Sequence, residues 1–542
     1  MQKESASAAV DNPPSDSDWS KISDHNSQEV IALGNPILKL NGHSLTVQDV
    51  VNVARKGFQV SLDPAAVSFV ERGAEMVRRW VDSGRVIYGI TTGFGDLASV
   101  QISADQSRQL QENLLKSHAC GVGSPLPEET VRAIMLLRIN TLIRGFSGIG
   151  LPALTQLVNF LNSGIHPIIP DQGSVGASGD LCPLSHLAVS LLGFGEVVYK
   201  GKRQQALEAM KDAGLEPIRL GPKEGLALNN GTAALTGIAA LALHDATQVF
   251  KVADIAGALS VEALHAVPYA FDPRTHDLRP HGGQKNVAAN IRRLIEGSEI
   301  IEAYKMDRVQ DAYSIRCMPQ VHGASRDALD YVRQKVEIEI NSVTDNPIIF
   351  PADEDVISGG NFHGQPIALA MDFFGIALSE IASISERRVA RLVDHKLSGL
   401  PPFLIENSGV NSGFMIPQYV AAAVVSENKV LAHPASVDSI PTSANQEDHV
   451  SMGFHASKKG QAILDNAKKV LAIELLAAAQ GVDFSAPLKP GKGTAAAHHE
   501  IRKTIAHVKE DVFLYPLIEK ALALVNRGSL VAAVEEAVGA LL

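Results

Sequence analysis

Three stretches of this sequence combine side chains that could do chemistry. Residues 173–186 (GSVGASGDLCPLSH) place one serine among small residues, with an aspartate two positions later and a histidine at the end. Residues 310–320 (QDAYSIRCMPQ) contain a tyrosine and an arginine, and residues 445–448 (NQED) contain two adjacent carboxylates. A guanidinium matches a carboxylate through two parallel hydrogen bonds, so the arginine of the second stretch could bind a carboxylate or form a structural ion pair.

Several other chemical motifs are missing from the sequence. His498, His499 and Glu500 are adjacent and so lack the HExxH spacing, and no four-cysteine or Cys₂His₂ zinc spacing occurs. There is no GxSxG elbow and no GxxxxGK[ST] loop, and Gly145–Gly150 (GFSGIG) departs from GxGxxG. Metal, nucleotide and ordinary serine-nucleophile chemistry are therefore disfavoured, and we expect no metal and no external cofactor.

Composition narrows the class of protein. The 542 residues include 48 Lys and Arg against 59 Asp and Glu, a net charge of −11, which argues against nucleic acid or an anionic membrane as the main partner. No stretch reaches the roughly 18 uninterrupted apolar residues of a spanning helix. Three widely spaced cysteines offer no disulfide framework, and the N-terminus has no hydrophobic signal region. We expect a cytoplasmic protein.

Long apolar periodic segments must position these residues. Gln365–Lys396, Gly460–Gly481 and Asn230–Val261 predict helices that are apolar on nearly every face, and such helices belong inside a bundle. Strand-like signal is short, at Arg85–Ile90 (RVIYGI) and Glu196–Lys202 (EVVYKGK). The sequence therefore predicts a mainly α protein with a long central helical bundle, preceded by a mixed, loop-rich N-terminal region.

Four segments follow from this organisation. We expect residues 1–30 to be a disordered tail, because their composition cannot bury a core. Residues 31–225 form the predicted loop-rich N-terminal domain and residues 226–485 the central bundle. Residues 486–542 form a C-terminal helical segment after a break at Pro487–Gly493.

The first stretch also carries a family resemblance. GSVGASGDLxPLSH resembles the segment from which the aromatic amino acid ammonia-lyases and aminomutases build 4-methylidene-imidazol-5-one (MIO), an electrophile made from their own backbone. The resemblance extends over nearly the whole chain from about residue 37, and residues 441–453 are most similar to the histidine-specific branch. Further matching motifs are YGITTGFG (88–95), SHACGVG (117–123), EGLALNNGT (224–232), NSVTDNP (341–347) and SGGNFHGQP (358–366).

The resemblance implies a role for each residue of the tripeptide. The Gly179 nitrogen would attack the Ala177 carbonyl to close the ring, which only a residue without Cβ allows, and Ser178 would lose its hydroxyl as water. Asp180 is the family's candidate for assisting this cyclisation. An N-cap of the helix that starts near Leu181 is an equally good interpretation of Asp180.

The same resemblance assigns the catalytic groups. Tyr88 matches the base that removes the β-proton of the substrate. An ordinary phenol has a pKa of about 10, so its surroundings must be electropositive. Arg316 would bind the substrate carboxylate, although a structural ion pair is the alternative.

Other assigned residues are less distinctive. Tyr313 and Asn230 match polar residues around the MIO and the amine, whereas Asn230 could be a turn former. Phe362 resembles an aromatic residue near the prosthetic group, or is a core phenylalanine. Gln320, which ends its motif, is assigned to substrate binding.

Substrate choice depends on two further positions. Glu447 lies where the phenylalanine and tyrosine enzymes carry an amide, and a carboxylate there can accept a hydrogen bond from an imidazole N–H. His118 would supply a second contact, or is a loop histidine satisfied by backbone. Departures from the family pattern include Asn229, which puts substrate preference in doubt, and Cys182, which replaces a usual alanine.

Taken together, the resemblance implies an ammonia-lyase/fumarase-like fold and non-oxidative deamination of L-histidine to trans-urocanate, the first step of histidine degradation. It also implies a homotetramer whose active sites take residues from three subunits. A tyrosine or phenylalanine ammonia-lyase or 2,3-aminomutase is the first rival, and Glu447 weighs against it. A catalytically inactive family member is the second, and the intact tripeptide, Tyr88 and Arg316 weigh against it.

Overall fold

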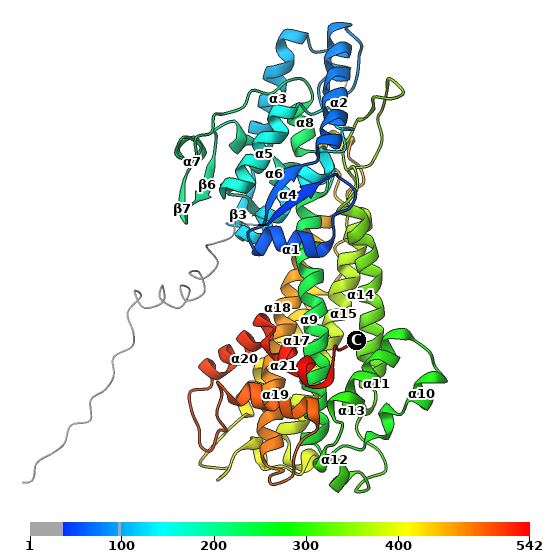
Figure 1. Ribbon diagram of the computed structural model, residues 1–542, viewed down its shortest axis with the longest axis vertical. Coiled ribbons are helices and arrows are strands. Elements are labelled where there is room, and N and C mark those ends of the chain that lie inside the picture. Colours follow the sequence, from blue (N-terminus) through cyan, green and yellow to red (C-terminus); the bar gives the residue numbers. More distant parts are fainter. Residues whose placement is uncertain (1–35, 96–98) are drawn as a thin grey trace, which may run out of the picture.

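A computed structural model describes residues 36–95 and 99–542 of the chain, so the predicted tail at 1–30 lies outside the described residues. The molecule is elongated, and long helices run along its axis between two wider ends (Figure 1). The N-terminal elements gather at one end and the C-terminal helices at the other.

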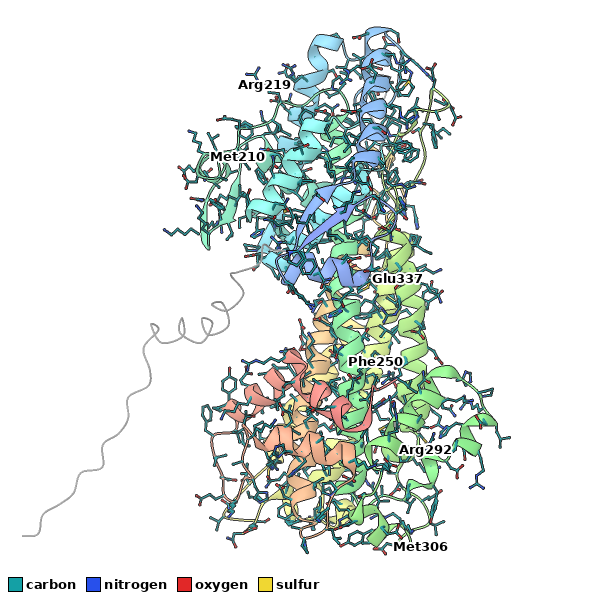
Figure 2. The ribbon with its side chains drawn as sticks, viewed as in Figure 1. Met210, Arg219, Phe250, Arg292, Met306 and Glu337 are labelled. Atoms are coloured by element: carbon teal, nitrogen blue, oxygen red, sulfur yellow. The ribbon has the colours of Figure 1, made fainter. Side chains whose placement is uncertain are left out.

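Four helices form the centre of the molecule. They are α9 (Ala233–Ala263), α14 (Met318–Glu339), α15 (Gln365–Val393) and α18 (Gly453–Asp483). Helix α18 packs along both α15 and α9, and Phe250 of α9 is buried at the narrow middle of the molecule (Figure 2). Helices α9 and α15 are long and apolar enough to cross a membrane, but most of each apolar window is buried against the rest of the chain. The predicted helical bundle is therefore confirmed.

The N-terminal end combines helices with three small sheets. These sheets are the parallel pair β1–β2, the antiparallel pair β3–β5 and the antiparallel three-stranded sheet β4–β6–β7. The elements are β1 (Ile37–Leu40), α1 (Val47–Arg55), β2 (Gln59–Leu62), α2 (Pro64–Asp82), α3 (Ala104–His118), β3 (Val122–Pro125), α4 (Glu128–Leu142), α5 (Leu151–Ser163), β4 (His166–Pro167), β5 (Pro170–Gln172), α6 (Leu181–Leu191), β6 (Glu196–Tyr199), β7 (Lys202–Gln205), α7 (Ala206–Asp212) and α8 (Glu224–Asn229).

Two predicted strands differ from the structure. Arg85–Ile90 is a turn, because the Thr91 hydroxyl donates to the Arg85 carbonyl and accepts from the Ile87 N–H, which replaces a strand ladder. Glu196–Lys202 is a strand only to Tyr199. The backbone then turns through Lys200 and Gly201, both with positive φ, and Lys202 starts the partner strand of a hairpin.

The opposite end consists of short helices and loops around the distal halves of α9, α15 and α18. Its elements are η3 (Pro268–Phe271), α10 (Pro273–Asp277), α11 (Gly282–Leu294), α12 (Glu299–Tyr304), α13 (Tyr313–Arg316), α16 (His395–Ser398), η4 (Pro402–Leu404), α17 (Met415–Leu431), α19 (Lys492–Arg502), α20 (Tyr515–Arg527) and α21 (Ser529–Val538). The hairpin of β8 (Ile348–Phe350) and β9 (Asp355–Ile357) and the short helix η5 (Ser443–Asn445) lie near the N-terminal end instead. The domain boundaries after residues 225 and 485 stay predictions.

A buried charge network ties the central helices together. Glu474 of α18 and Arg388 of α15 are both fully buried, with Arg388 Nη2 2.8 Å from Glu474 Oε2. The same carboxylate accepts hydrogen bonds from the Ser260 hydroxyl of α9 at 2.7 Å and the Ser385 hydroxyl at 2.6 Å. Since every oxygen of Glu474 has a partner, the network fixes how α9, α15 and α18 pack against each other.

Loss of the Glu474 charge tests this network. We expect Glu474→Gln to lower the free energy of unfolding by about 3–5 kcal/mol, because it leaves the Arg388 guanidinium buried without its counter-ion. Denaturant unfolding at matched protein concentration measures the change. The control is Glu71→Gln at an exposed position of α2, for which we expect a change of about 0.5 kcal/mol or less. Equal stability of both variants would contradict a structural role for the network.

Candidate active site

The tripeptide Ala177-Ser178-Gly179 lies in the turn between β5 and α6, where it touches the N-terminal end of α9. Gly179 has φ +68°, and a Cβ at this position would approach the Gly231 carbonyl oxygen far inside contact distance. The Asp180 N–H donates to the same carbonyl at 2.7 Å. A glycine is therefore required at residue 179, and the loop is attached directly to the segment that leads into α9.

Asp180 anchors the tripeptide through its side chain. Its buried carboxylate accepts hydrogen bonds from the Ala234 and Leu235 N–H groups, at 2.9 and 2.8 Å, in the first turn of α9. The predicted alternative, an N-cap of α6, is corrected: Asp180 occupies that position but its side chain caps α9 instead. Burial raises the pKa of Asp180 to about 7, although these two N–H groups act in the opposite direction. This carboxyl group can therefore exchange a proton near neutral pH.

A cavity of about 1100 Å³ opens beside the tripeptide. Loops and helix ends from five separate parts of the chain converge on it, which explains why the motifs are so far apart in sequence. The predicted site residues that line it are Tyr88, His118, Ser178, Asn230, Phe362 and Glu447.

Glu447 is positioned by a tightly turned loop before α18. Its carboxylate accepts from the Thr442 hydroxyl at 2.7 Å and from the Ser178 hydroxyl at 3.4 Å. The three residues Ser443–Asn445 all have positive φ, and Thr442 and Glu447 exchange backbone hydrogen bonds across this turn. Non-glycine residues pay for left-handed φ values with about 1–3 kcal/mol each, and such residues cluster at functional sites.

His118 and Tyr88 lie on other walls of the cavity. His118 Nδ1 is 2.9 Å from the Ser117 hydroxyl, and burial lowers the pKa of His118 below its ordinary value, so the imidazole is neutral near pH 7. The Tyr88 hydroxyl accepts a hydrogen bond from the Gly95 N–H at 3.2 Å. Its own proton therefore remains available to a second partner in the cavity.

The orientation of the Asn230 amide is fixed by its neighbours. Asn230 Nδ2 donates to the Asn346 carbonyl at 2.9 Å and to the Asp345 carboxylate at 3.3 Å, and Asp345 is paired in turn with buried Lys223 at 2.8 Å. Asn230 Oδ1 is buried without a partner. Because both amide hydrogens face protein acceptors, the free oxygen is left to accept a hydrogen bond from a ligand. Sequence analysis missed Asp345 and Asn346 although both lie in the NSVTDNP motif, whereas Lys223 lies just before a quoted motif.

Tyr313, Arg316 and Gln320 are not brought to this cavity. Helix α13 lies at the opposite end of the bundle (Figure 1), where the Ser314 carbonyl accepts from Arg388 of α15. Arg388 is about 35 Å along α15 from its start beside the cavity, at 1.5 Å per residue. The Arg316 guanidinium covers the Tyr313 ring at 4.6 Å and donates to the Asp311 carbonyl, and Tyr313 is 70% exposed.

The cavity also lacks the expected positive charge. Among the described residues that line it, none is lysine or arginine, and Glu447 is the one carboxylate. Asn229, which departs from the family pattern, is buried and donates to the Ser185 hydroxyl of α6 at 3.0 Å instead of lining the cavity. The electropositive surroundings that a phenolic base needs must therefore come from elsewhere.

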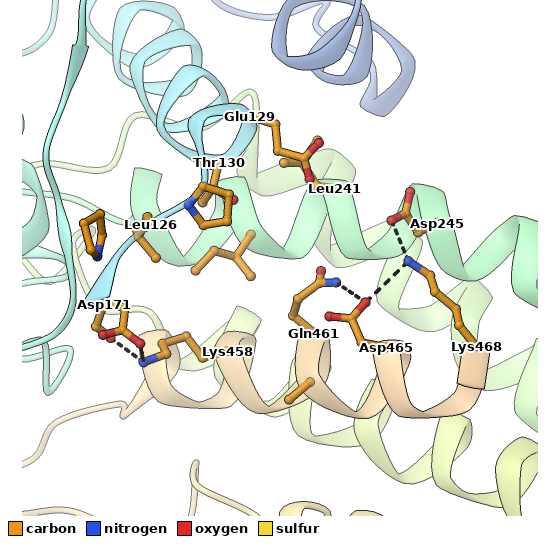
Figure 3. A pocket seen from close by; sticks show the side chains of 14 residues that line it. Leu126, Glu129, Thr130, Asp171, Leu241, Asp245, Lys458, Gln461, Asp465 and Lys468 are labelled. Carbon is orange, nitrogen blue, oxygen red and sulfur yellow. Dashed lines mark hydrogen bonds and ion pairs between the residues drawn. The ribbon is translucent and has the colours of Figure 1, made fainter. Parts of the chain in front are cut away.

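A second cavity, of about 410 Å³, lies between the N-terminus of α4, α9 and α18 (Figure 3). Its charges are already paired: Lys458 with Asp171 at 2.7 Å, and Lys468 with Asp245 and Asp465 at 3.1 and 3.5 Å. It contains none of the predicted site residues, and in the part of the chain that the structure describes no three His, Cys, Asp or Glu side chains group as a metal site would require.

Comparisons with known proteins agree with this geometry. The sequence profile of the aromatic amino acid lyases matches residues 45–503. The histidine ammonia-lyase of Alkaliphilus oremlandii is 54% identical over 92% of this chain and 99% of its own. The crystal structure of histidine ammonia-lyase from Trypanosoma cruzi is 40% identical with a TM-score of 0.87, covering 93% of this chain and 96% of that one.

A tyrosine aminomutase from Streptomyces globisporus has the same mainly α fold, with 36% identity, a TM-score of 0.88 and coverage of 93% of this chain and 99% of that one. Overall fold therefore does not separate lyases from aminomutases. The family profile covers most of the chain and the first relative is matched over almost its full length. The chain belongs to the aromatic amino acid lyase family.

Proposed function

We propose that this protein is a histidine ammonia-lyase that converts L-histidine to trans-urocanate and ammonia. The observation that carries the proposal is the position of the Glu447 carboxylate, which lies within hydrogen-bond distance of Ser178 and lines the same cavity as neutral His118. A carboxylate and a neutral imidazole can bond the two ring nitrogens of a substrate imidazole, but give a benzene ring nothing. The similarity to relatives named histidine ammonia-lyases supports the same substrate.

Residues 177–179 fit the formation of an MIO group. The backbone of Gly179 already turns with positive φ in a space that excludes a side chain, and Ser178 faces the cavity. Asp180, with its pKa near 7, can take and return a proton while the ring closes. When formed, the MIO group supplies an electrophile for the substrate amine, with no metal or external cofactor.

The other residues of this chain bind and deprotonate the substrate. Tyr88 would take the β-proton through its hydroxyl, and the free Asn230 Oδ1 would accept a hydrogen bond from the amine. Phe362 would pack against the prosthetic group from the loop that precedes α15. The carboxylate of the substrate has no cationic partner among the described residues of this cavity.

A homotetramer with shared active sites would complete the cavity. Arg316, Tyr313 and Gln320 lie at the far end of their own chain, so they would enter the active site of another subunit and supply the missing positive charge. An apolar stripe of Leu369, Phe373 and Ile376 is exposed along α15, and such a stripe favours self-association. In this proposal the enzyme is cytoplasmic, acts on a small amino acid, and involves neither nucleic acid nor membrane.

The rival functions predict different properties of the same cavity. A tyrosine or phenylalanine enzyme would have to desolvate the Glu447 carboxylate against an uncharged ring, which is costly. An inactive binding protein would not need the tight turn at Gly179, which follows Ala177 and packs against the head of α9. The chemistry of the cavity therefore favours a histidine ammonia-lyase over a tyrosine or phenylalanine enzyme and over an inactive family member.

Self-processing of the tripeptide can be read from the mass of the intact protein. We expect the purified chain to be about 36 Da lighter than its translated sequence, because ring formation releases two waters. Ser178→Ala should show the full translated mass and lose activity. Active enzyme with an unchanged mass would eliminate the MIO assignment.

Mixed oligomers test whether active sites are shared. Ser178→Ala and Arg316→Ala should each be inactive alone. When both are co-expressed in equal amounts, about one quarter of the sites should receive an intact Ser178 and an intact Arg316 from different subunits, so activity should return to about that fraction of wild type. Two wild-type chains with different tags provide the control for expression. Activity no higher than that of the single variants would show that sites are not assembled in this way.

Glu447 is the test of substrate choice. We expect Glu447→Gln to lower kcat/KM for histidine by about ten- to two-hundredfold, which corresponds to the roughly 1.5–3 kcal/mol of a charge-assisted hydrogen bond. Discrimination against phenylalanine and tyrosine should shrink, because the unpaired carboxylate is gone. The matched control is Asp448→Asn, an exposed neighbour that does not line the cavity.

Product absorbance with all three amino acids measures these effects. Equal losses for every substrate, or a wild-type preference for phenylalanine or tyrosine, would contradict the assignment of Glu447 to imidazole recognition.

A further inference from the structure

Two cysteines meet beside the tripeptide, although 62 positions separate them in the sequence. Cys120 follows the end of α3, two residues after His118, and Cys182 lies in the first turn of α6, three residues after Gly179. Both line one cavity of about 320 Å³, together with the tripeptide, His118 and Glu447. Cys182 is buried and Cys120 is exposed, and neither is in a disulfide.

The β3–β5 pair explains how the cysteines come together. Val122 pairs with Gln172, so the chain on either side of this pair continues as Gly121 and Gly173. The Cys182 sulfur lies in the fork between these glycines: a Cβ added to Gly121 would be 3.1 Å from it, and one added to Gly173 would be 2.9 Å away. With no side chain in between, the sulfur lies directly beside the backbone at Cys120.

The two thiols are near neighbours in this fork, because both line the same cavity and the Cys182 sulfur lies beside Gly121, the residue that follows Cys120. Burial raises the pKa of the Cys182 thiol to about 11. The next residue, Gly121, is fixed on its other side by its N–H, which donates to His186 Nε2 of α6 at 3.0 Å. The end of α3 and the two residues that follow it, 117 to 120, are therefore the part that can move toward Cys182.

We propose that Cys120 and Cys182 form a redox-active pair that hydrogen peroxide converts to a disulfide, closing the active site reversibly. Exposed Cys120 meets the oxidant first: its sulfur attacks one peroxide oxygen, becomes a sulfenic acid and releases water. The Cys182 sulfur then attacks the Cys120 sulfur, and the hydroxyl leaves with the Cys182 proton as a second water. Two thiols lose two electrons in total, and the peroxide gains them.

The disulfide would displace a substrate contact. An S–S bond is about 2.05 Å long, whereas two thiols in contact are well over 3 Å apart, so the loop must shift by more than about 1 Å. His118 is two residues from Cys120 and lines both this cavity and the larger one. Since a misplacement of about 1 Å can cost a hundredfold in rate, we expect activity to fall by about tenfold or more. This part of the inference depends on the proposed function, whereas the disulfide itself does not.

The experiment uses the full-length enzyme carrying Cys317→Ser, which leaves only these two thiols. Treatment with hydrogen peroxide should yield a Cys120–Cys182 linked peptide on non-reducing digestion, with activity toward histidine falling by about tenfold or more and returning with dithiothreitol. The matched control adds Cys182→Ala. It should keep its activity before oxidation, form no linked peptide, and accumulate Cys120 sulfenic acid that dimedone labels.

Each other outcome has a definite meaning. Dimedone labelling of Cys120 in the enzyme that retains Cys182, with no linked peptide, would overturn the pair. A linked peptide with unchanged activity, or equal activity loss in the Cys182→Ala control, would overturn the closure of the site. If the linked peptide forms but the reduced enzyme does not act on histidine, the proposed substrate fails and the thiol pair stands.

Discussion

The hydrogen bonds from the first turn of α9 to Asp180 are the contact on which the site depends. They join the short loop that carries Ala177-Ser178-Gly179 to the head of α9, a long helix that is buried over most of its length. The Asp180 carboxyl group thereby accepts hydrogen bonds from N–H groups at the start of α9, which have no partner within the helix. Glu474 fixes α9 to α15 and α18, so the tripeptide is attached to a helix that the whole bundle holds in place.

Much of the fold could be predicted from local pattern. The apolar runs at 230–261, 365–396 and 460–481 predicted buried helices, and the tripeptide motif includes Ser178, which lines the larger cavity. The strand at Arg85–Ile90 was wrong because two threonine hydroxyls, invisible to periodicity, fold it into a turn. The acceptor role of Asp180 toward α9 could not be predicted either, since its donors lie 54 and 55 residues further along the chain.

The site residues divide in a similar way. Motifs gave the identities of the six side chains that line the main cavity, but not the partners that orient them, such as Thr442 for Glu447. The position of Arg316 could not be predicted from its own motif, because a local motif does not tell which end of the 29-residue helix α15 its segment will lie against. In one chain the cavity has a single carboxylate and no described cation, and the proposed homotetramer would supply the missing cation from another subunit.

The turn before α18 has an evolutionary consequence. Thr442 and Glu447 bond to each other through both backbone and side chain, so the six residues between and including them close on themselves. The conformation of this turn depends little on contacts with the bundle, and the packing of the bundle depends little on the turn. In the proposed function, exchange of this one loop would change selectivity, while the proposed electrophile, its contact with α9 and the helices stay constant. Such a scaffold would diversify its substrates without refolding, and a histidine ammonia-lyase and a tyrosine aminomutase do share this overall fold, with TM-scores of 0.87 and 0.88 to this chain.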